Sequence, residues 1–177
     1  MTQAGTGQLE ENKNNFTREL EGIKNELAKS LERERIFLTL TREEIQRRLQ
    51  WISAAQKVVS DYRSAIGTIS TGEAVKSERS EPIEKQLSEI RDQMDPDTSL
   101  YVPWIIFHQR GLTLRALAQE KTSSGERQKL WTERGETGQP RNLAFGSAAQ
   151  KVLELLRAEH DKLVRDRDVV STAGASA

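Results

Sequence analysis

Apolar residues recur at a helical spacing along the first 69 residues of the chain. They first include Leu9, Phe16, Leu20, Ile23, Leu27 and Leu31, and later Ile45, Ile52, Val59 and Ile66 with Ala55, Tyr62 and Ile69 between them. Steps of three, four and seven residues place these side chains on one helix face, with a small drift near Leu31. Charged residues flank the stripe. The pattern predicts amphipathic, coiled-coil-like helices over residues 9–38 and 42–69.

The connection between these two helical segments has two interpretations. Thr41, Arg42, Glu43 and Glu44 match a capping box, which is typical of a helix start. The same residues could also lie inside one continuous helix. Two β-branched threonines at 39 and 41 favour a break and therefore an antiparallel hairpin.

The rest of the chain alternates between shorter apolar stripes and polar segments. We predict flexible tails over 1–8 and 171–177, a linker over 70–82 and shorter helices within 83–170. A mobile loop is expected over 122–146, and a turn of helix around 126–132 is an alternative for part of it. Pro82 marks the start of the first short helix and Pro103 the start of the second. Ser147 and Gln150 form a capping box that predicts the start of the last helix.

Composition favours elongated helices over a compact sphere. Hydrophobic residues make up 35% of the chain and charged residues 31%, whereas compact domains average roughly 45–50% and 25%. The predicted fold class is all-α, with a long helical hairpin or coiled coil followed by two or three shorter helices and a long loop. The chain has no cysteine, which excludes disulfides and thiolate metal sites.

The sequence contains no recognisable catalytic or metal-binding pattern. The two histidines, His108 and His160, have no carboxylate three or four residues before them, so the helical spacing for metal ligands is missing. Phosphate-loop and nucleophile-elbow motifs are also missing. We therefore expect no catalytic residues, no cofactor and no metal, and a protein that is not an enzyme.

Charge is balanced overall but not locally. Residues 71–100 carry four basic and eight acidic side chains, whereas residues 101–145 carry seven basic and four acidic ones. These segments could fold onto each other or contact different partners. Basic and aromatic residues anchor many protein interfaces, and the candidate partner-binding residues are Trp51, Trp104, Arg110, Arg115, Trp131 and Arg134.

Two functions are consistent with these patterns. The leading hypothesis is a non-enzymatic helical scaffold, adaptor or assembly subunit that binds protein partners, including a second copy of itself. The alternative is a nucleic-acid-binding accessory protein that uses the basic segment 104–141. No run approaches the roughly 20 apolar residues of a membrane span, and cytoplasmic location is the default expectation.

Overall fold

The computed structural model describes the backbone of residues 4–173 and the side chains of residues 16–172. Its elements are α1 (Ala4–Gly67), the 3₁₀ turn η1 (Thr68–Thr71), α2 (Ser77–Asp92), α3 (Tyr101–Gln119), α4 (Ser124–Thr132) and α5 (Arg141–Ala173). The described part of the chain contains no β-strand, only one isolated bridge between Arg134 and Pro140. The all-α fold class is confirmed. Residues 1–3 and 174–177, to which the predicted tails extend, lie outside the described residues.

The chain divides into two compact units, and each of the two longest helices contributes residues to both. Arg47–Arg165 forms one unit, which we call the bundle; the other unit draws on residues before Arg47 and after Arg165. The division therefore falls within α1 and α5. Each unit is described by itself below.

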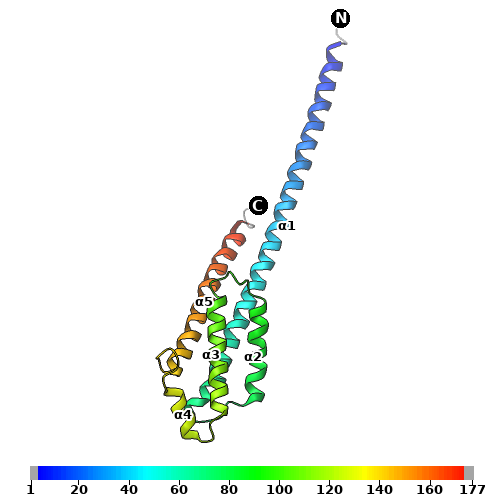
Figure 1. Ribbon diagram of the computed structural model, residues 1–177. Coiled ribbons are helices and arrows are strands. Elements are labelled where there is room, and N and C mark those ends of the chain that lie inside the picture. The colour runs from blue at the N-terminus through cyan, green and yellow to red at the C-terminus, as the bar shows by residue number, and fades with distance from the viewer. Residues whose placement is uncertain (1–3, 174–177) are drawn as a thin grey trace. The chain divides into compact units, whose positions relative to one another are not determined.

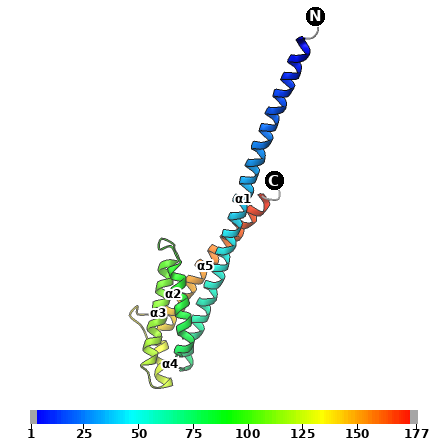
Figure 2. The ribbon, with the colours of Figure 1, turned by 90° about the vertical axis from the view of Figure 1, so that its right-hand side faces the viewer.

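The bundle is built from the second half of α1, α2, α3 and the first part of α5, which run side by side in both views, with α4 at one end (Figures 1 and 2). Fully buried side chains from all four long segments form its core: Ile52, Val59, Tyr62 and Ile66 from α1, Leu87 from α2, Trp104 and Phe107 from α3, and Val152 and Leu156 from α5. The predicted stripe at 52, 59 and 66 is thus the face that α1 buries.

Aromatic rings fill the centre of the bundle. Tyr62 meets Phe107, His108 and Phe145 edge-on, with ring centroids 5.7, 6.0 and 6.2 Å apart. Phe107 and Phe145 stack with centroids 5.3 Å apart. Such geometries add to the stabilisation that comes from burial alone. Three helices, α1, α3 and α5, are therefore joined through one aromatic cluster.

The expected break near Thr39–Thr41 is wrong, because α1 is a single helix through this region (Figure 2). The Thr39 and Thr41 hydroxyls donate to the carbonyls of Arg35 and Phe37, both at 2.9 Å. These hydroxyls bond backwards to the preceding turn instead of capping a new helix. Of the two interpretations of residues 9–69, the continuous helix is the one observed.

Helix boundaries after residue 70 also differ from the prediction. Helix α2 begins at Ser77, so Pro82 lies inside it. The predicted loop over 122–146 contains α4 and the start of α5, which leaves a connection of residues 133–140. Ser147 lies inside α5 and is not a cap. The capping box that does form joins Ser123 and Glu126 at the start of α4.

None of the described helices combines the length and the apolar character that a bilayer-spanning segment needs.

Candidate interaction surface

Large apolar side chains on the first half of α1 are exposed to solvent. Phe16, Leu20, Ile23, Leu27 and Leu31 are exposed by 62, 42, 62, 60 and 48% of their area. We call these five residues the exposed seam. Their spacings of four, three, four and four residues place them on one face of the helix. A contiguous row of this kind is typical of an interaction surface, whereas single exposed apolar residues are ordinary.

The residues that follow on the same face are progressively covered. Leu38 is half-buried and Ile45 is buried. Beside them, the Arg42 guanidinium donates to the carbonyl of Val170 near the end of α5, at 3.2 Å. In this unit the same helix face therefore changes from buried at residue 45 to exposed over residues 16–31.

A second apolar cluster lies between the exposed seam and Ile45. Ile36, Phe37 and Leu40 are exposed by 52, 68 and 60%. At 100° per residue these three side chains point away from the seam face, so with Leu38 the helix is apolar on several sides here. A helix that is apolar all round is normally covered by several neighbours.

Only part of the predicted partner-binding set lies at the surface. Trp104 is fully buried, and its indole N–H donates to the Leu87 carbonyl at 3.0 Å, so the folded bundle cannot offer it to a partner. Trp51 and Trp131 are half-buried, and Arg134 is exposed. The sequence indicated an aromatic and basic cluster, but the fold spreads these residues over α1, α3, α4 and the following loop.

Most cations of the basic segment bind groups within the bundle. Arg110 donates to the Ala144 carbonyl at 2.6 Å, and Arg127 donates to the Gly72 and Lys121 carbonyls, both at 2.7 Å. Arg141 pairs with Glu133 at 3.1 Å. These guanidinium groups hold loops and helix ends in place. They are therefore less available for phosphates than the sequence alone suggests.

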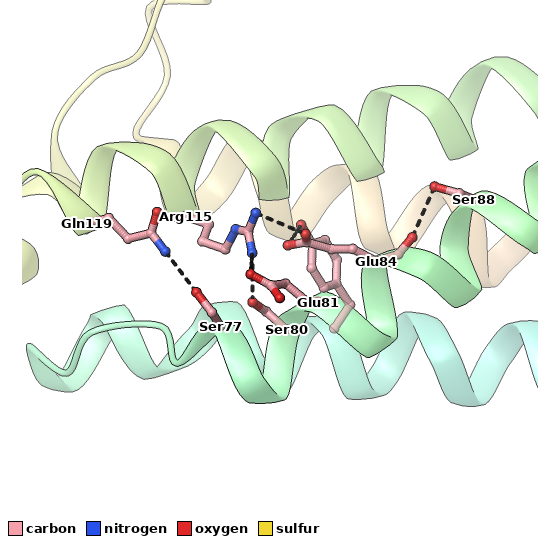
Figure 3. Close-up of polar contacts among 8 residues, drawn as sticks. Ser77, Ser80, Glu81, Glu84, Ser88, Arg115 and Gln119 are labelled. Carbon is pink, nitrogen blue, oxygen red and sulfur yellow. Dashed lines mark hydrogen bonds and ion pairs between the residues drawn. The ribbon is translucent and has the colours of Figure 1, made fainter.

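A network of polar contacts joins α2 to α3 in the bundle (Figure 3). The Arg115 guanidinium lies 3.2 Å from the Glu84 carboxylate, 3.8 Å from that of Glu81, and donates to the Ser80 hydroxyl at 3.2 Å. Tyr62 donates to the other Glu84 oxygen at 3.3 Å. The acidic and basic segments therefore do fold onto each other, as one of the two sequence interpretations proposed.

Burial is the largest influence on the pKa values of Glu84 and Tyr62 in this network. Burial raises the pKa of Glu84 above its usual value, and the positive charge of Arg115 opposes that rise. Burial and the neighbouring carboxylate raise the pKa of the Tyr62 phenol well above its usual range. Perturbed groups mark many active sites, but structural networks perturb pKa values too. Here every member is bonded to another member, which is the arrangement of a structural network.

A shallow hollow lies between α3 and the connection from α4 to α5. Its volume is about 290 Å³, and Ile106, Leu117, Arg110 and Arg141 are among its lining residues. Both arginines already bind groups of the chain, Ala144 and Glu133. The hollow therefore presents no converging set of reactive groups.

Ser80 and His108 are the buried polar side chains among the described residues of the bundle. His108 is 8% exposed, and its Nε2 atom has no hydrogen-bond partner among the described residues. Burial lowers the pKa of His108, and the charge of Arg91 lowers it further. Aromatic packing against Tyr62, not a catalytic contact, defines its surroundings.

We expect His108 to make the protein sensitive to mild acid. The unfolded chain takes up a proton near pH 6.5, whereas folded His108 does so only at lower pH. Its contribution to stability is therefore present above pH 6.5 and is lost as the pH falls through the folded value. Urea unfolding at pH 7.5 and 5.5 should show a smaller loss for His108→Phe than for the wild type. An equal loss in His108→Phe and in the wild type would contradict the assignment.

Comparison with protein-family models, with curated proteins and with solved structures finds no match for this chain. Among the described residues, no group of three or more histidine or acidic side chains is placed to hold a metal ion. The candidate site is therefore defined by the geometry of the exposed seam alone.

Proposed function

We propose that the protein is a non-enzymatic assembly subunit that binds a helix of another chain through the exposed seam. The single observation that carries the proposal is the exposure of Phe16, Leu20, Ile23, Leu27 and Leu31 on one face of α1. Full burial of one such side chain contributes about 1.5–3 kcal/mol. Each of the five is about half exposed. Burying all of them against a partner would therefore contribute a binding free energy several times RT.

The packed half of α1 supports the same interpretation. Ile45, Ile52 and Val59 follow the same seven-residue spacing and are buried. A face of the same composition and spacing before residue 32 is suited to the same kind of contact. The partner chemistry that it fits is an amphipathic helix with its own apolar stripe.

The nucleic-acid alternative has weaker support. Stacking on bases requires accessible aromatic rings beside free cations. Trp104 and Phe107 are buried, and Arg110, Arg115, Arg127 and Arg141 bind groups of the bundle. Binding to RNA or DNA that weakens steeply with added salt would revive this alternative.

Charged substitutions in the seam should release the protein from its native assembly. In Leu20→Glu and Leu27→Glu, the interface would have to bury a carboxylate without a partner, which is strongly unfavourable. We expect roughly 100-fold weaker association, or more, in each variant, which corresponds to about 2.7 kcal/mol. Size-exclusion chromatography with light scattering, on protein isolated at low salt from its source, measures the mass of the assembly.

Lys29→Glu is the matched control, because Lys29 lies on the opposite face of the same helix and is exposed. It introduces the same charged group without entering the seam. The proposal predicts that this variant stays in the native assembly. An assembly that keeps its mass in all three variants would rule the seam out as the docking surface.

A further inference from the structure

We draw no further inference here: the strongest candidate, the exposed seam on the first half of α1, belongs to the site already described, and nothing in the structure shows what covers it.

Discussion

Gly111→Ala is expected to lower the free energy of unfolding by about 1–3 kcal/mol, the range for overpacked cores, or by more. A Cβ atom at this position would overlap Cε1 of the Tyr62 ring and lie 2.7 Å from Cζ and the hydroxyl oxygen. Tyr62 is fully buried among Phe107, His108 and Phe145, so the ring has no room to move aside. Urea unfolding followed by circular dichroism measures the change.

Two controls separate this contact from the general effect of replacing a helical glycine. Gly146 lies inside α5 with nothing within 4 Å of an added Cβ, so Gly146→Ala should stabilise the protein by about 0.5–1 kcal/mol. In a Tyr62→Ala background the added methyl group has space, so the cost of Gly111→Ala should largely vanish. An equal cost with and without the ring would show that the contact is not the cause.

Arg115→Met is expected to cost about 3 kcal/mol near neutral pH, because it leaves a largely buried carboxylate without its cation. The Glu84 side chain is only 12% exposed, and Arg115 is its ion-pair partner. Methionine keeps much of the length and the apolar stem of arginine. The loss should therefore reflect charge more than packing, and thermal or urea unfolding measures it.

The double variant Arg115→Met with Glu84→Gln is the matched control. It removes both charges, while the amide oxygen can still accept from Tyr62, so most of the lost stability should return. A double variant as unstable as Arg115→Met would show that packing, not the unpaired carboxylate, accounts for the loss.

The cost of Arg115→Met should depend on pH with a defined sign. Arg115 opposes the rise in the pKa of Glu84, so its removal lets that pKa rise further. A raised carboxyl pKa favours the folded state below the unfolded value of 4.5, and this benefit disappears as the pH rises through the folded value. The stability gap between variant and wild type should therefore be small near pH 4.5 and widen towards neutral pH. A gap that is constant with pH would contradict this account of Glu84.

The periodic positions of the chain were predictable because burial follows helix geometry. The spacing at 45, 52, 59 and 66 identified the buried face of α1. The threonines at 39 and 41 misled the prediction, because a hydroxyl that caps a helix can equally bond to the carbonyl four residues before it. Local sequence does not decide between these two uses. The residues on both sides form helix, so the helix continues through the two threonines.

The candidate site was predicted only in part, for a related reason. The sequence identified the stripe of Phe16 to Leu31, but it could not show which half of α1 the other helices cover. Trp104 illustrates the opposite case, since its place in the fold turns a candidate anchor into core. The capping box at Ser123 and Glu126 was visible as a Ser-x-x-Glu pattern and was missed because a long polar segment surrounds it.

The uninterrupted course of α1 has a consequence for the cost of assembly. Starting a helix is the unfavourable step, since the first turn fixes several residues for a single hydrogen bond, whereas each later residue adds a bond of its own. Because the second half of α1 is packed in the bundle, residues 16–40 extend a helix that has already begun. A partner that binds there does not have to supply the energy of nucleation. Amide hydrogen exchange should accordingly slow steadily from residue 16 towards residue 45, as in a helix that frays from one end only.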